Sequence, residues 1–185
     1  SPAMERRIGE QVLNELRHDP SWLGDAEVNA YLNRLGNRVA GYVEGGRLTV
    51  ELFALRDATL NAFAAPGGVI GVHTGLILAA ESESELTSVI AHEISHLTQH
   101  HQARMMNKAG QGQVASIAAL VIAVLAAQSN PDLAIGAATA GQAVSIQNQL
   151  NYSRDFEREA DRIGLELLER SGYDIRSMES FFLRL

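Results

Sequence analysis

The segment Ala91-His-Glu-Ile-Ser-His96 lies in the middle of a predicted helix and decides the fold class and the chemistry that the chain can support. The helix begins at Ser82, and Glu85 follows three residues later in the pattern of a capping box. We expect the helix to run to about Asn107 and to stop before Gly110. The motif therefore lies mid-helix, as metal-dependent chemistry requires.

Two histidines four residues apart form the metal-ligand pattern of this helix. His92 and His96 lie on one face, near enough to bind one metal ion. Neutral imidazole is a good ligand for zinc, and Glu93 can reach a water molecule on the metal without itself being a ligand. The spacing is typical of zinc proteases, and the alternative is a surface helix that carries two histidines by chance.

The third ligand has to come from elsewhere, because a catalytic zinc site usually keeps three protein ligands and an open position. Gln99 and Gln102 stand where a metzincin would have glycine and histidine, so that class is excluded. A second predicted helix, from about Asn151 to Arg170, carries carboxylates instead. This helix is the expected source of the missing ligand.

Three acidic residues of the second helix face in two directions. Glu157 and Asp161 are one turn apart and share a face, whereas Glu159 points about 160° away from Glu157. Glu157 can be the third ligand, and Asp161 can accept the second N–H of a ligand histidine, which fixes the tautomer of the ring. A solvated charged helix is the alternative for this stretch alone. Together with the histidine helix, the pattern favours a metal site.

Apolar periodicity predicts a mostly helical chain with a small sheet early in the sequence. Pro66-Gly67-Gly68 predicts a turn between two short extended pieces, and Gly172 is the residue expected just after the last helix. The fold class is therefore α+β, a mostly helical zincin-like domain with a central active-site helix. Besides the two helices above, we expect helices over 4–18, 25–42, 113–127 and 132–149, a half-buried strand over 47–55, and the extended pieces within 61–72.

Composition limits the classes of protein to which the chain can belong. Its 185 residues suit one domain, and 15 basic against 22 acidic residues give a net charge of −7. No basic run is present, so we expect no nucleic-acid binding. The absence of cysteine excludes a disulfide scaffold, a thiolate metal site and a cysteine nucleophile. The longest uninterrupted run of apolar and small residues, Val114–Ala127, is shorter than the about 20 residues that a membrane-spanning helix needs.

Three motifs, in this order along the chain, resemble those of a known family. They are Asn61-Ala-Phe-Ala-Ala-Pro-Gly-Gly68, Ala91-His-Glu-Ile-Ser-His96 and Tyr152-Ser-Arg-Asp-Phe-Glu-Arg-Glu-Ala-Asp161. The combination is similar to the zinc metallopeptidase (gluzincin) family of the CAAX prenyl protease, HtpX and BepA. The resemblance extends from the first helix to about Phe182. It implies a single metallopeptidase domain over 1–185, with an N-terminal targeting segment and a C-terminal continuation outside this chain.

The resemblance implies a zinc-dependent endopeptidase with one zinc ion per chain. His92, His96 and Glu157 would be the ligands, Glu93 the general base, and Asp161 the carboxylate that orients a ligand histidine. In this chemistry the base takes a proton from water and later passes it to the leaving amine. The family also implies a role in protein quality control in the bacterial cell envelope.

A polypeptide substrate is the expected partner. In the resembled family the segment that corresponds to 61–68 forms an edge strand along the active-site cleft, where an extended peptide can pair with the backbone. A donor for the developing oxyanion, besides the metal, is expected from Tyr152 or Arg154. The candidate substrate-binding residues are therefore Phe63, Ala64, Gly67, Gly68, Tyr152 and Arg154.

Two further histidines and an apolar hairpin have more than one interpretation. His100 continues the i, i+4 row of the motif and either lines the cleft or is a polar surface residue. His101 lies on another face, and we expect it to make a structural hydrogen bond. The hairpin over 113–149 belongs to the core or else contacts a membrane surface or a partner protein.

Two other functions stay open beside the endopeptidase. A chaperone-like or binding module on a protease scaffold would keep the zinc in a plugged site. A helical interaction protein without metal would need the histidine motif to be accidental. Metal analysis separates the last function from the first two, and turnover of casein separates the peptidase from the binding module.

Overall fold

The computed structural model describes residues 2–45, 48–101 and 143–184. The α+β class is confirmed, with the sheet early in the chain as expected. In the described ranges, no helix is long and apolar enough to cross a membrane. The helices and strands are α1 (Pro2–Arg17), β1 (Trp22–Leu23), α2 (Ala26–Ala40), β2 (Glu51–Leu55), β3 (Ala62–Ala65), β4 (Val69–His73), α3 (Thr74–Ala79), α4 (Glu83–Thr98), α8 (Ala143–Arg170) and α9 (Arg176–Phe182).

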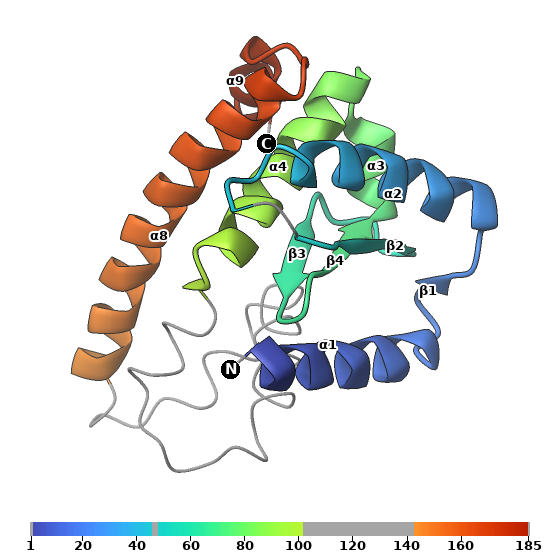
Figure 1. The fold of residues 1–185 in the computed structure, drawn as a ribbon, viewed down its shortest axis with the longest axis horizontal. Coiled ribbons are helices and arrows are strands. Elements are labelled where there is room, and N and C mark those ends of the chain that lie inside the picture. The colour runs from blue at the N-terminus through green and yellow to red at the C-terminus, as the bar shows by residue number, and fades with distance from the viewer. Residues whose placement is uncertain (1, 46–47, 102–142, 185) are drawn as a thin grey trace.

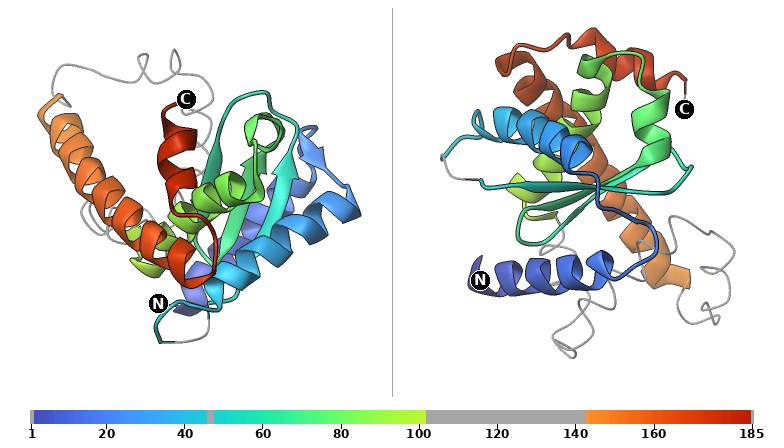
Figure 2. Two further views of the ribbon diagram at one scale, coloured as in Figure 1. Left: turned by 90° about the horizontal axis from the view of Figure 1, so that it is seen from above. Right: turned by 90° about the vertical axis from the view of Figure 1, so that its right-hand side faces the viewer.

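Within the described part of the chain, a four-stranded mixed sheet lies between two layers of helices (Figures 1 and 2). The strand order is β1-β2-β4-β3, in which β2 and β4 are parallel and the two outer pairs are antiparallel. Helix α1 covers one face of the sheet, and α2 and α4 lie over the other (Figure 2, right). Strand β3 is therefore an edge strand.

Alternate residues of the strands point into two separate cores, as the period of two in a strand requires. Leu52 and Ile70 are buried in the larger core, which they share with α2, α4 and α8. Phe53 and Val69 face the other way and pack with α1. On that side Phe53 stacks on Trp22, with 4.7 Å between the ring centroids. The sheet is thereby fixed on both faces, and α4 is anchored in the larger core.

The ends of two helices follow the sequence closely. Asp25 caps α2 by accepting hydrogen bonds from the backbone N–H groups of Glu27 and Val28. Ser82 caps α4 in the same way by accepting from Glu85 N–H, and this confirms the predicted start of the motif helix.

The predicted C-terminal end of the motif helix is wrong. Helix α4 ends at Thr98 rather than near Asn107, because His100 adopts a left-handed backbone conformation with φ of 50°. A non-glycine residue holds this conformation only when neighbouring contacts compensate for its strain. The next residue, His101, is buried, and its ring stacks on Phe156 of α8.

The predicted start of the last helix is also wrong. Helix α8 begins at Ala143, so residues 143–149, which the sequence pattern predicts as part of a separate hairpin helix, belong to it. No glycine or proline lies between 143 and 151, so nothing there breaks the helix. Its end is as predicted: Gly172 has a φ of 85°, and Tyr173 N–H donates to Leu168 O as in a Schellman motif. The rest of the hairpin, 113–142, lies outside the described residues.

Candidate metal centre

The two helices that carry the predicted site residues, α4 and α8, cross in direct contact (Figure 1). Gly164 of α8 lies at the crossing. A Cβ atom there would be 3.1 Å from the Cα of His92 and 3.2 Å from its backbone nitrogen. Almost any side chain would push the helices apart by a few tenths of an ångström. The glycine therefore sets the separation at which the acidic residues of α8 reach His92.

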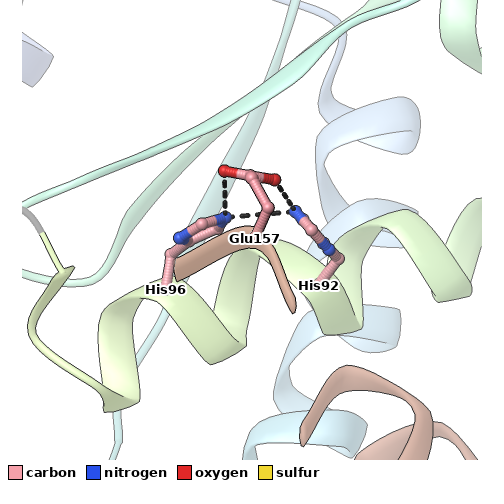
Figure 3. Close-up of side chains that lie close together, drawn as sticks. All are labelled: His92, His96 and Glu157. Atoms are coloured by element: carbon pink, nitrogen blue, oxygen red, sulfur yellow. Dashed lines mark hydrogen bonds and ion pairs between the residues drawn. The ribbon is translucent and has the colours of Figure 1, made fainter. Parts of the chain in front are cut away.

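Three side chains converge between these helices (Figure 3). The Nε2 atoms of His92 and His96 are 3.1 Å apart. Glu157 reaches over both rings, with Oε2 3.2 Å from Nε2 of His92 and Oε1 3.5 Å from Nε2 of His96. One ligand atom from each residue lies within 4.8 Å of the other two. The structure thus brings together the three residues that the sequence predicts as ligands.

The spacing of the ligand atoms is compatible with a zinc ion. Two atoms that each lie about 2.0–2.1 Å from a tetrahedral zinc ion are about 3.3–3.4 Å apart. The distance of 3.1 Å between the two Nε2 atoms and that of 3.2 Å from Nε2 of His92 to Oε2 of Glu157 lie close to this value, and the other carboxylate oxygen, Oε1, is 3.5 Å from Nε2 of His96. Two imidazole nitrogens and one carboxylate are also a common ligand set for catalytic zinc. The Glu157 side chain is 52% exposed, so one side of the group faces solvent, where an open position would be needed.

The charges around His92 favour a cation at this point. Burial alone would lower the pKa of His92, but contacts with Asp161 and Glu157 and the nearby charge of Glu93 outweigh it and raise the pKa to about 10. The contacts with the two imidazoles hold the pKa of Glu157 well below its usual range. A metal ion competes with protons for such ligands, so a site that stabilises this positive charge can also stabilise a divalent cation.

The outer nitrogen of His92 meets the second predicted carboxylate of α8. Nδ1 of His92 lies 3.0 Å from Oδ1 of Asp161, which is one helical turn beyond Glu157. A carboxylate at this place favours the tautomer with the proton on Nδ1. Nε2 of His92 then keeps its lone pair for a metal.

Glu93 is near the metal-ligand group but is not a member of it. Its side chain is half-buried. Burial raises the pKa of its carboxyl, while the charges of His92 and His96 and a backbone hydrogen bond with Ala64 act in the opposite direction. A carboxyl with a raised pKa suits a group that takes up and releases a proton near neutral pH.

Strand β3 brings two of the predicted substrate-binding residues next to α4. The side chain of Phe63 is buried in the core on the α1 side, 6.2 Å from Phe53 between ring centroids. Ala64 is only partly buried, and its backbone bonds to Glu93. A peptide beside β3 would therefore meet Phe63 through the backbone alone.

The two glycines of the predicted turn have a packing role. Gly67 and Gly68 join β3 to β4 with φ of 86° and 87°. A Cβ atom at Gly67 would be 2.8 Å from the backbone oxygen of Glu5 in α1, and one at Gly68 would overlap the backbone oxygen of Thr49. This close approach explains both glycines, and a contact between them and a substrate stays a prediction.

The two predicted oxyanion donors both belong to α8. Arg154 is exposed and lies three residues before Glu157. The side chain of Tyr152 lies outside the described part of the chain.

Two residues that the sequence patterns assign to other faces lie behind His96: His101 contacts it, and Glu159 contacts His101. Nδ1 of His101 is 2.8 Å from Nδ1 of His96, and Nε2 of His101 is 3.0 Å from Oε2 of Glu159. His100 does not continue the row of ligands, because it is exposed and lies 3.4 Å from Glu5. Helical periodicity misses these contacts because they form beyond the end of α4. His101, five residues after His96, is the feature of the sequence from which this contact could have been predicted.

Known proteins are similar to nearly the whole chain. The model of peptidase family M48 matches residues 26–184. The putative beta-barrel assembly-enhancing protease of Vibrio cholerae is 42% identical over 177 residues, 96% of this chain and 37% of that protein. The beta-barrel assembly-enhancing protease of Escherichia coli is 32% identical over 185 residues, 100% of this chain and 38% of that protein.

A mitochondrial protein is also similar. Mitochondrial metalloendopeptidase OMA1 of Schizosaccharomyces pombe is 30% identical over 159 residues, 84% of this chain and 43% of that protein. The chain thus spans less than half the length of each of these relatives.

Proposed function

Because the chain belongs to peptidase family M48, we propose that it hydrolyses internal peptide bonds with one zinc ion held by His92, His96 and Glu157. The observation that carries this proposal is the convergence of their three ligand atoms within 4.8 Å, with Glu93 beside them. A bound zinc ion supplies Lewis-acid chemistry, which polarises a carbonyl oxygen and lowers the pKa of water.

Glu93 is the proposed general base. Its carboxylate takes one proton from the attacking water while the water oxygen bonds to the carbonyl carbon of the substrate. The same carboxyl then gives the proton to the leaving nitrogen as the C–N bond breaks, so Glu93 ends in its starting state. Its half-buried position and raised pKa support both transfers.

The proposed substrate is an extended polypeptide that lies along the outer edge of β3. Two observations support this position. β3 stands at the end of the strand order, and the backbone of Ala64 on this strand bonds to Glu93. A peptide paired there would pass close to the proposed base. Backbone hydrogen bonds depend little on the side chains of the substrate, so broad recognition of unfolded polypeptides is expected.

The biological setting is proposed from the relatives. Two bacterial proteins named for enhancing beta-barrel assembly are 42% and 32% identical to this chain. We propose that the chain acts in protein quality control in the bacterial cell envelope, and this similarity supports the proposal. Misassembled polypeptides would be its substrates there.

The function can be tested with zinc analysis and a casein assay on the purified chain. We expect about one zinc ion per chain, cleavage of casein, loss of cleavage with chelator, and recovery when zinc is added back. Absence of zinc both after purification without chelator and after add-back would contradict the metal site.

The same assay addresses the binding-module alternative. Helix α9 borders the site, because the ring of Phe182 lies 6.4 Å from that of His92. If the parent chain binds zinc without cleaving casein, and the Phe182→Ala variant cleaves it, the site of the parent is plugged by Phe182. Zinc binding without cleavage by either form would favour the binding module over the peptidase.

A further inference from the structure

A buried histidine lies directly behind His96. His101 is 2% exposed, and its ring stacks on Phe156 with 4.1 Å between centroids and 12° between planes. Both of its nitrogens face polar partners: Nδ1 is 2.8 Å from Nδ1 of His96, and Nε2 is 3.0 Å from Oε2 of Glu159. The three side chains form a continuous chain of contacts that leads away from the proposed metal position.

The end of α4 makes this arrangement possible. On a continuous helix, a residue five positions after His96 would point about 140° away from it. The helix stops at Thr98, and the left-handed backbone of His100 turns the chain so that His101 comes back over His96. Packing against Phe156 from α8 then holds the ring in place.

The protons along this chain can be arranged consistently in one way. If Nε2 of His96 keeps its lone pair for the metal, the proton of that ring is on Nδ1. Two nitrogens 2.8 Å apart need one donor and one acceptor, so Nδ1 of His101 has to accept this proton. The proton of His101 is then on Nε2, which donates to Glu159. Each contact thus sets the tautomer of the next.

His92 offers a direct comparison within the same site. Its Nδ1 reaches the carboxylate of Asp161 at 3.0 Å. For His96 the carboxylate is Glu159, and the ring of His101 stands between them. Metal-binding histidines almost always give their second N–H to such a partner, which orients the ring and raises its basicity.

We propose that His101 and Glu159 are positioning residues that hold the ring and the tautomer of His96 for metal binding. The inference rests on the proposed function, since it assigns a partner to one of the proposed ligands. Neither residue touches the metal position, and both act through His96. The competing explanation is that His101 only fills space against Phe156.

Two substitutions separate these explanations. His101→Phe keeps a flat ring that can stack on Phe156 but removes the acceptor for Nδ1 of His96. Glu159→Gln keeps the shape but lets the side chain donate as well as accept, so the tautomer of His101 is no longer fixed. Glu166→Gln is the matched control, because Glu166 pairs with Arg162 on an exposed face of the same helix.

The zinc dissociation constant is the first measurement. We expect it to rise about 10–100-fold in His101→Phe, less in Glu159→Gln, and not at all in Glu166→Gln. The thermal midpoint of each variant in chelator checks the fold separately from the metal. Affinity of His101→Phe equal to that of the parent would overturn the proposal, and so would a loss of affinity no greater than in the Glu166→Gln control.

Long-range ¹H–¹⁵N spectra of the zinc-loaded parent give a second readout that does not depend on a variant folding. We expect the proton of His96 on Nδ1 and that of His101 on Nε2. A proton on Nδ1 of His101 would overturn the proposal even if every variant unfolds. Failure of the parent to bind zinc would instead contradict the proposed function, so the two failures are distinguishable.

Discussion

His92 and His96 point their Nε2 atoms at the same place, but different parts of the chain hold their outer nitrogens. His92 lies where Gly164 of α8 packs against the backbone of α4, and the carboxylate of Asp161 on α8 reaches it directly. His96 lies near the end of α4, where a second histidine from beyond the helix links it to α8. Regular helices suffice for the first arrangement, whereas the second needs a helix to end at the right residue.

The largest expected effect comes from Glu157, the residue that contacts both His92 and His96. Glu157 places one carboxylate oxygen near each histidine, so Glu157→Ala removes the third ligand from both at once. We expect the variant to lose stoichiometric zinc binding and all cleavage of casein. Zinc analysis after dialysis against zinc measures it, with the exposed Glu166→Ala as the control. Full zinc occupancy in Glu157→Ala would show that the third ligand lies elsewhere.

The next largest effect is expected from a substitution that leaves both ligand histidines and their partners unchanged. Glu93→Gln removes the proton acceptor without removing a ligand, so we expect casein cleavage to fall about 10²–10⁴-fold with zinc content unchanged. Rates of cleavage and zinc content have to be measured on the same preparation. Near-parental cleavage would refute the role of general base, and loss of zinc would move Glu93 into the ligand set.

The difference between the partners of His92 and His96 is tested by Asp161→Ala and Glu159→Ala. We expect zinc affinity to fall about 10–100-fold for Asp161→Ala, because its carboxylate contacts a ligand histidine directly. A smaller loss is expected for Glu159→Ala, since the ring of His101 stands between. Helical periodicity alone predicts parental affinity for Glu159→Ala. Competition titrations with a chelator therefore separate the structural account from the sequence pattern, and a larger loss for Glu159→Ala would reverse the comparison.

The smallest effect is expected at the helix crossing. Gly164→Ala places a methyl group 3.1 Å from the Cα of His92 and shifts α8 by a few tenths of an ångström. Because alanine favours helix by about 1 kcal/mol over glycine, the strain and the propensity offset each other in the stability of the fold. We expect zinc affinity to fall several-fold with little change in the thermal midpoint in chelator. A matched substitution on the same helix, Glu169→Ala, should change neither.

The sequence predicted the parts of the site that depend on regular helices. His92 and His96 at i, i+4, Glu157 and Asp161 at i, i+4, and the cap at Ser82 all follow from local spacing. The structure places these residues as the spacing implies.

The contacts that the sequence did not predict depend on where a helix stops. The left-handed backbone of His100 was not predicted, because only a few per cent of non-glycine residues adopt a positive φ. It ends α4 early and turns His101 toward His96. The sequence patterns miss the length of α8 for the opposite reason: a stretch without glycine or proline continues the helix toward its N-terminus.

The most direct test of the account is an anomalous diffraction map, recorded at the zinc edge from crystals of the chain grown with zinc. We predict one strong peak at about 2.0–2.1 Å from Nε2 of His92 and Nε2 of His96, and at similar distance from the carboxylate of Glu157. Nδ1 of His96 should stay within hydrogen-bonding distance of Nδ1 of His101. A peak that lacks any of the three ligands, or no peak between α4 and α8, would contradict the account.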